Sequence, residues 1–438
     1  MPEVHPERKL RLPALRKLAC GAIAVAFVAG MAFSVILRFA RARCINFEEE
    51  VSALRSTARQ VTRTTPCLAT RQGNAWDEYT IADHALASLG YEEKVALSHC
   101  GWSRWGGVPT NSEREVAFRV VERETDVLRH LMAGTRSNSA SIDISSHRSG
   151  AAEFPHTLQL AGSFLAVASQ SRLKAGDVAG ALELLADMLQ FGDDCARIPR
   201  LCCLETGARI LLSACDRIRS VLILSPEAVG DRRVIEKWLL VAEENLPSLQ
   251  FYVSGELAWA IEDVLKLPRG GRVGGVPRRR LWRQLFSYDV ALSEGVKEFL
   301  RWNAEMAGAD GRPWELARAT YPRIAEQAAS TGNPFVHEID WRVRYPERMP
   351  SQAESYRRLL ATMRLLRAGL MALRGARPGD SGWPDDPFPQ TPMRLRTEGS
   401  RILVWSEDFD GNAGGVGNWM RSTRTANEDL VLELLRAP

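Results

Sequence analysis

The sequence LAVASQSRLKAGDVAGALELLADML, residues 165–189, contains two apolar helical patterns separated by a Gly-Asp turn at residues 176–177. The spacing predicts one helix over residues 156–174 and a second over residues 178–191. Glycine commonly ends helices because it adopts the left-handed backbone conformation without Cβ strain. The two helices are therefore expected to form an antiparallel hairpin, against which a third helix over residues 201–221 packs.

Outside this hairpin, apolar residues recur every three to four positions along most of the chain. The pattern predicts further helices over residues 48–63, 76–97, 113–133, 225–265, 281–306, 314–329 and 352–374. Beyond the last of these helices, short β-like runs occupy residues 393–396, 402–405 and 430–434. The expected fold class is mainly α, with a small C-terminal β unit that packs on the preceding helix.

One segment, LACGAIAVAFVAGMAFSVIL at residues 18–37, contains no charged residue. A helix of this length spans about 30 Å, which matches the hydrocarbon core of a bilayer. The preceding residues carry five Lys or Arg against two Glu, which favours an N-terminus inside the cytoplasm and an exported C-terminal part. The alternative is a signal peptide with its cleavage site at residues 40–42, Ala-Arg-Ala.

This segment and a Gly/Pro/Arg-rich loop set the predicted organisation of the chain. The predicted parts are a basic cytoplasmic tail (1–17), a transmembrane anchor (18–38), a helical domain (39–267), a linker loop (268–280), a second helical region (281–376) and a β tail (377–438). The expected location is the inner (cytoplasmic) membrane, crossed once, with the C-terminal domain outside, in the periplasm.

Charge and cysteine patterns argue against two classes of site. Lys and Arg number 57 and Asp and Glu 53, and the two signs are interspersed. A nucleic-acid-binding surface needs clustered Lys and Arg, so we expect no nucleic-acid partner. Four of the eight cysteines lie in one helical stretch without a paired C-x2-C zinc pattern, which indicates small buried apolar residues. These four are Cys195, Cys202, Cys203 and Cys215.

No catalytic motif is complete in this sequence. Residues 171–174, Ser-Arg-Leu-Lys, fit the S-x-x-K pattern of serine acylases, but the companion K-T-G is absent and the tetrad falls at a helix end. Glu256, Glu262 and Asp263 have the spacing of an acid–base pair on one helix side, or of a solvated helix face. We therefore predict no catalytic residue.

Residues 408–412, Asp-Phe-Asp-Gly-Asn, have a metal-binding pattern. Alternating oxygen-bearing side chains with Gly at the bend are typical of the first half of a Ca²⁺ loop. The loop has no Glu at its twelfth position, so it is not an EF-hand. The candidate Ca²⁺ ligands are Asp408, Asp410, Asn412 and, from the last predicted strand, Asp429. The alternative is a solvated turn between two strands.

The tail resembles a known family. WPDDPFPQTPMRLR at residues 383–396, RILVWSEDFDGNAGGVG at 401–417 and EDLVLEL at 428–434 resemble the C-terminal segment of major pseudopilins of type II secretion. The resemblance implies a short sheet and a glycine-rich loop that helps to hold Ca²⁺. The chain lacks a prepilin leader and the glutamate five residues into the span, so only the fold of the tail and its loop carry over.

Two further resemblances concern the helical part. The hairpin at residues 165–189 resembles one tetratricopeptide-type (TPR-like) unit, without a second copy at the period of about 34 residues that such arrays need. GNAWDEY at residues 73–79 and GDVAGAL at 176–182 resemble uncharacterised bacterial membrane-anchored helical proteins. That family implies no activity.

The sequence favours a non-catalytic, membrane-anchored envelope protein whose helical module binds an unidentified protein or peptide partner. The alternative is an envelope hydrolase with its active site in a helical groove. A shallow groove lined with aromatic and Arg side chains favours the binding protein. A deep pocket with convergent Asp, Glu or His side chains of shifted pKa favours the enzyme.

Overall fold

The computed structural model describes most of the chain from residue 47 onward. The described residues are 31, 47–59, 70–102, 108–141, 154–225, 232–266, 272–273, 276–277, 288–310, 312–333, 335–336, 345–399, 401–406 and 430–435. The predicted transmembrane segment 18–37 lies outside them, apart from Met31. Among the helices of the described ranges, none has both the length and the apolar character needed to cross a bilayer.

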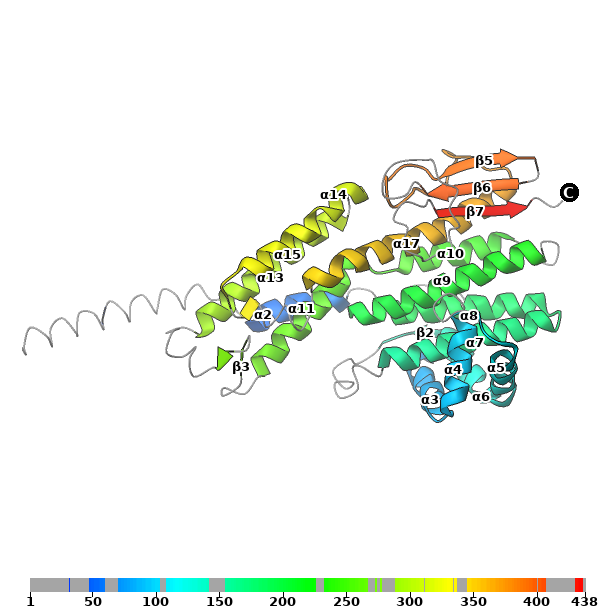
Figure 1. The fold of residues 1–438 in the computed structure, drawn as a ribbon, viewed down its shortest axis with the longest axis horizontal. Coiled ribbons are helices and arrows are strands. Elements are labelled where there is room, and N and C mark those ends of the chain that lie inside the picture. Colours follow the sequence, from blue (N-terminus) through cyan, green and yellow to red (C-terminus); the bar gives the residue numbers. More distant parts are fainter. Residues whose placement is uncertain are drawn as a thin grey trace, which may run out of the picture.

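The described part of the chain is mainly helical and carries a small β unit near its C-terminus, which confirms the predicted fold class at this level (Figure 1). The helices are α2 Phe47–Arg59, α3 Ala75–Ala87, α4 Tyr91–Gly101, α5 Asn111–Arg123, α6 Thr125–Thr135, α7 Phe154–Lys174, α8 Val178–Ala196, α9 Leu201–Leu224, α10 Arg232–Asn245, α11 Leu249–Lys266, α13 Tyr288–Asp310, α14 Trp314–Arg318, α15 Thr320–Ser330 and α17 Tyr345–Leu373. The strands are β1 Arg71–Asn74, β2 Ser137–Ser139, β3 Arg272–Val273, β4 Val276–Pro277, β5 Arg394–Glu398, β6 Arg401–Ser406 and β7 Leu430–Leu435.

The predicted hairpin is confirmed as α7 and α8, with α9 packed on both. Gly176 has a positive φ of 81°, which only glycine adopts without strain. The Asp177 side chain then caps α8 by accepting a hydrogen bond from the backbone N–H of Gly180 at 2.8 Å. From Gly180 to Ala196, every residue of α8 except Glu183 is buried. α8 is therefore the centre of the core.

Segment 314–329, which was predicted as one helix, forms α14 and α15 in the structure. Two longer predicted helices are also broken. Segment 76–97 forms α3 and α4, and the backbone N–H of Gly90 starts α4 by donating to Glu93. Segment 113–133 forms α5 and α6, which are separated by Glu124 at φ −91° and ψ 49°. The apolar spacing continues across both breaks, so periodicity did not reveal them.

The C-terminal strands confirm the predicted β unit. β5, β6 and β7 form an antiparallel sheet in that order. One face of this sheet is buried and packs on α17, as Figure 1 shows. Packing on a helix stabilises a small sheet of this kind. The residues of this face are Ile402, Val404, Leu432 and Leu434.

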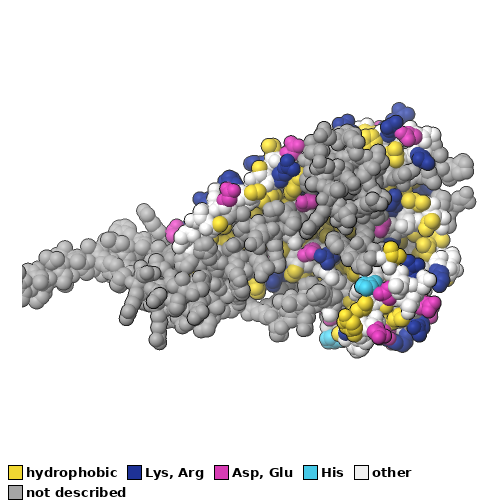
Figure 2. Space-filling model, viewed as in Figure 1, with side chains coloured by type: hydrophobic (Ala, Val, Ile, Leu, Met, Phe, Trp, Pro, Cys, Tyr) yellow, Lys and Arg dark blue, Asp and Glu magenta, His cyan; other side chains and the backbone are white. Residues whose placement is uncertain are grey.

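Helices α3 to α6 form a lobe beside the α7–α8 hairpin (Figure 1). Within the lobe, β1 pairs in parallel with β2, which ties the start of α3 to the end of α6. Side chains of both charge signs are mixed over the part of the lobe visible in Figure 2. This lobe carries the candidate site.

Candidate functional site

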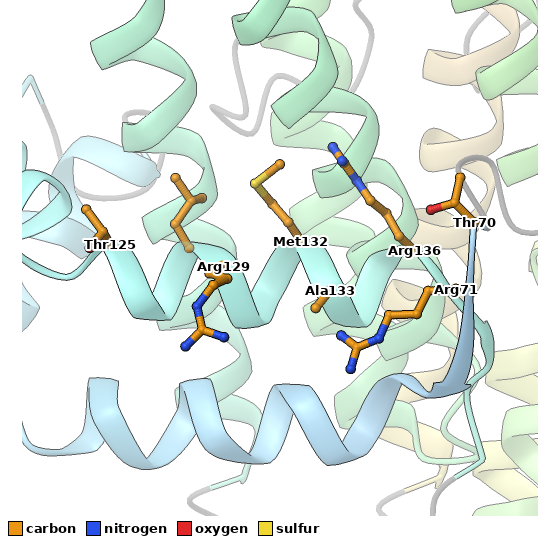
Figure 3. Close-up of a pocket in the computed structure, with 8 residues that line it drawn as sticks. Thr70, Arg71, Thr125, Arg129, Met132, Ala133 and Arg136 are labelled. Atoms are coloured by element: carbon orange, nitrogen blue, oxygen red, sulfur yellow. The ribbon is translucent and has the colours of Figure 1, made fainter.

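A groove of about 390 Å³, open to solvent, runs along one side of α6 (Figure 3). Its lining residues, which define the α6 groove, are Thr70, Arg71, Thr125, Leu128, Arg129, Met132, Ala133 and Arg136. Six of them come from α6 and the residue that follows it, whereas Thr70 and Arg71 lie at the start of β1. The groove therefore joins one helix face to a strand from an earlier part of the chain.

The spacing of the lining residues explains the shape of the groove. Between residues 125 and 136 they recur at i, i+3, i+4, i+7, i+8 and i+11, which is one face of an α-helix. The face is therefore about 16 Å long at 1.5 Å per residue. The opposite face is buried against α3 and α8, and a Cβ at Gly134 would lie 2.3 Å from the Tyr79 ring. α6 is thus packed on one side and open on the other.

Arg136 carries positive charge into the groove from a buried anchor. Its Nη2 and Nε donate to the two carboxylate oxygens of Asp187 on α8, at 3.0 Å and 3.3 Å. The Thr135 hydroxyl donates to the same carboxylate, which is completely buried. Burial raises the pKa of Asp187, whereas the bond to Asp187 raises the pKa of Arg136. The guanidinium stays charged at the groove, and the carboxylate lies behind it.

Arg71 is held in a similar way. Its Nη2 donates to Glu78 Oε1 on α3 at 2.7 Å, and His130 Nδ1 lies 2.6 Å from Glu78 Oε2. The hydrogen bond with His130, together with the charge of Arg71, holds the pKa of Glu78 below its ordinary value. The Glu78 side chain is largely buried and the Arg71 side chain is half exposed. The Arg71 guanidinium, rather than the Glu78 carboxylate, is therefore the group exposed at the groove.

The third cation, Arg129, is the most exposed of the three. Its only acidic partner that the described residues show is Asp126, at 3.1 Å on the same helix. Both side chains are more than half exposed, and such pairs contribute little to stability. Arg129 is therefore free to turn toward a bound anion at small cost. Of the four carboxylates near the groove arginines, Glu78 and Asp187 are shielded, whereas Asp126 and Glu183 are exposed.

The floor of the groove is apolar. Leu128, Met132 and Ala133 are partly buried and line it between the arginines. Met adapts its shape to many partners because its side chain is unbranched and polarizable. An apolar strip flanked by guanidinium groups suits an amphipathic ligand that carries carboxylates.

Further polar groups lie behind the groove, in the core around α8. The Tyr79 hydroxyl donates to Asp194 at 2.7 Å, and Gln190 donates to the other oxygen of Asp194 at 3.1 Å. Arg197 Nε donates to Asp193 at 3.0 Å. All five residues are buried, so this network holds α3 to α8 and is not open to a substrate.

The predicted Ca²⁺ ligands lie in ranges that the structure does not describe. They are Asp408, Asp410, Asn412 and Asp429. Within the described ranges, no group of three or more His, Cys, Asp or Glu side chains is arranged to hold a metal ion. The calcium loop stays a prediction, which calorimetric titration of the full chain with Ca²⁺ tests.

The remaining sequence candidates have separate partners. Glu256 accepts hydrogen bonds from Arg200 Nε at 3.0 Å and from the backbone N–H of Leu201 at 2.9 Å. It is 6% exposed, so a solvated face is wrong for this residue. Glu262 pairs instead with Arg55 on α2. The side chain of Asp263 lies outside the described residues.

The S-x-x-K tetrad at residues 171–174 does not form an acylase site. It occupies the last turn of α7, as predicted. Lys174 Nζ lies 5.1 Å from the centre of the Phe118 ring, and Arg172 pairs with Asp177. The Lys174 ammonium therefore has an aromatic contact on α5, and the tetrad belongs to the hairpin turn.

The groove arginines were not identified from the sequence. A signal existed on α6, because Arg129 and Arg136 share one helix face with Leu128 and Met132. No signal existed for Arg71, which reaches the groove through the β1–β2 pairing. Both strands are short and polar, so they lack the alternation that predicts a strand.

Neither a protein-family model, nor a curated protein, nor a solved structure matches this chain.

Proposed function

We propose that this chain is a non-catalytic envelope protein, anchored in the inner membrane by residues 18–37, whose helical module binds an acidic, amphipathic helix of a partner protein. The α6 groove carries the proposal. Its length of about 16 Å corresponds to three turns of a docked helix. Its apolar floor and three arginines match apolar anchors at i, i+3, i+4 and i+7 flanked by Asp or Glu.

Charge geometry favours an acidic partner. Arg71 and Arg136 are fixed in place by the shielded carboxylates behind them, so little side-chain entropy is lost when they meet a ligand. A guanidinium forms paired hydrogen bonds with a carboxylate, which gives orientation as well as affinity. The TPR-like hairpin α7–α8 would act as the rigid support of this surface, because α6 and α7 both pack on α8.

Binding of a designed probe peptide tests the groove. The probe is a fluorescent amphipathic helix of about 15 residues, with Leu at helical spacing and Glu on both flanks. We expect it to bind the full-length, detergent-solubilised protein, with an affinity that falls as salt rises. The same peptide with Lys in place of Glu should not bind. Fluorescence anisotropy measures both.

Arg129→Glu sharpens this test, because Arg129 is exposed and contributes little to folding. We expect the affinity for the probe to fall at least about tenfold, a difference of about 1.4 kcal/mol. Arg323→Glu is the matched control, since Arg323 is a half-exposed arginine in a surface ion pair with Glu305 on α13. Equal affinities of the two variants, with unchanged melting temperatures, would reject the groove as the binding site.

The anchor is tested separately. Reporter enzymes fused after Pro438 should be active only outside the cytoplasm, because the basic flank before residues 18–37 favours a cytoplasmic N-terminus. Activity of a cytoplasmic reporter would reject this topology. A mature N-terminus near residue 43 would instead identify a cleaved signal peptide.

A further inference from the structure

Two adjacent cysteines at the start of α9 are not part of the α6 groove. Cys202 and Cys203 lie in the first turn of α9, and their sulfur atoms are 4.0 Å apart. Cys202 is partly exposed and Cys203 is buried. A third thiol, Cys195, is fully buried near the end of α8. A partly exposed cysteine therefore has its sulfur in contact with the sulfur of a buried one.

The surroundings give the two thiols different reactivity. The sulfur atoms of Cys202 and Cys203 are in hydrogen-bond contact, with either able to donate, and this contact lowers the pKa of Cys202 and raises that of Cys203. Burial and the charge of Glu256 raise the pKa of Cys202, whereas the Arg200 guanidinium, which pairs with Glu256, lowers it. Burial raises the pKa of Cys195 well above its ordinary value. Cys202 is thus the one thiol of the three with both access and thiolate character.

We propose that Cys202 and Cys203 form a redox pair that disulfide-bearing oxidants convert into an intramolecular disulfide. The Cys202 thiolate attacks one sulfur of the oxidant, forms a mixed disulfide and releases one thiolate. Cys203 then loses its proton and attacks the Cys202 sulfur, which forms the Cys202–Cys203 bond and releases the second thiolate. Two electrons and two protons leave the protein, and the disulfide of the oxidant is reduced to two thiols.

The Cys202–Cys203 disulfide requires the first turn of α9 to open, because the Cα atoms of adjacent residues are about 3.8 Å apart, below the usual range of about 4.4–6.8 Å in disulfides. It also requires the two sulfur atoms to close from 4.0 Å to about 2.05 Å. The backbone N–H groups of Cys203 and Leu204 both donate to the Arg200 carbonyl at 3.0 Å, so opening this turn breaks these two hydrogen bonds at the start of the helix. The backbone N–H of Leu201 is held by Glu256 at 2.9 Å. Oxidation is therefore expected to loosen the contact between α9 and α11.

Trypsin separates these thiols cleanly. Cleavage after Arg200 and Arg209 yields the peptide 201–209, LCCLETGAR, which contains only Cys202 and Cys203. Cys195 falls in the peptide 175–197. The full-length protein is incubated with glutathione disulfide, then denatured, alkylated with N-ethylmaleimide and digested. Mass spectrometry reads the state of each peptide.

We expect peptide 201–209 to carry no maleimide and to be lighter than its reduced form by two hydrogen atoms. Peptide 175–197 should be alkylated. Doubly alkylated 201–209, a persistent glutathione adduct on wild-type protein, or a cross-link to Cys195 would overturn the proposal. Cys203→Ser should trap glutathione on Cys202, and Cys202→Ser should react at least about tenfold more slowly. If either variant fails to fold, the mapping of the wild-type protein still decides the outcome.

Discussion

α6 and α8 are neighbouring helices that both carry aspartate among apolar residues, but in opposite environments. In α8, Asp187, Asp193 and Asp194 are buried, and each accepts hydrogen bonds from side chains of the protein. In α6, Arg129 is exposed, as is its acidic partner Asp126. The comparison teaches that residue type alone does not separate a structural polar group from a binding one. Whether the helix is packed on both sides, as α8 is, or on one side only, as α6 is, decides which role its polar side chains have.

The largest expected effect comes from the apolar side of α8. Leu185 is 1% exposed in the centre of the core, so Leu185→Ala removes buried methyl groups and leaves a cavity. We expect the free energy of unfolding to fall by about 2–5 kcal/mol, measured by urea denaturation. Leu224→Ala is the matched control, because Leu224 is 73% exposed at the end of α9.

The control variant should change stability by less than about 0.5 kcal/mol. If Leu185→Ala costs no more than Leu224→Ala, then α8 is not the centre of the core and the contrast with α6 fails.

A smaller effect is expected where α3 meets α8. Tyr79→Phe keeps the ring and removes only the hydroxyl that donates to Asp194 at 2.7 Å. Loss of a donor to a buried carboxylate costs about 1–3 kcal/mol, and the denaturant midpoint should fall accordingly. Tyr91→Phe is the control, since Tyr91 is 83% exposed. Equal stability of the two variants would mean that the polar network around α8 is dispensable.

Much of the helical fold was predictable from the sequence, and the reason is visible in α7 and α8. Their apolar spacing, the glycine at 176 and the cap at Asp177 are all local signals, and all agree with the structure. The breaks at Gly90 and Glu124 were missed, because the apolar spacing continues across both. At Gly90 a local signal was present, since Gly90 and Glu93 form the cap that starts α4.

The candidate site was less predictable for a physical reason. The groove exists because α6 turns at Glu124 and because β1 brings Arg71 beside Arg136, far away in sequence. Neither event leaves a periodic pattern. Glu256 gives the same lesson, since a glutamate on a predicted helix reads as solvated until the structure places Arg200 against it.

The smallest predicted effect concerns pH and the Glu78 pair at the groove. The pKa of Glu78 is lowered in the folded state, so the fold stabilises its ionised form. This contribution is present above the ordinary value of 4.5 and is lost as the pH falls through the lowered pKa. As the pH falls from about 5 to about 3, the free energy of unfolding should therefore decrease less for Glu78→Gln than for the wild type. The difference between the two decreases should be less than about 1 kcal/mol.

Denaturation of the wild type, Glu78→Gln and Glu92→Gln as a function of pH measures this effect. Glu92 is an exposed residue of α4, so its variant should follow the wild-type curve. Glu78 also positions Arg71. Glu78→Gln should therefore slightly lower the affinity for the probe peptide at neutral pH, whereas Glu92→Gln should leave this affinity unchanged. A Glu78→Gln curve parallel to the wild type would show that His130 and Arg71 do not stabilise the carboxylate. The cations of the groove would then lack the fixed anchors that distinguish α6 from an ordinary solvated helix face.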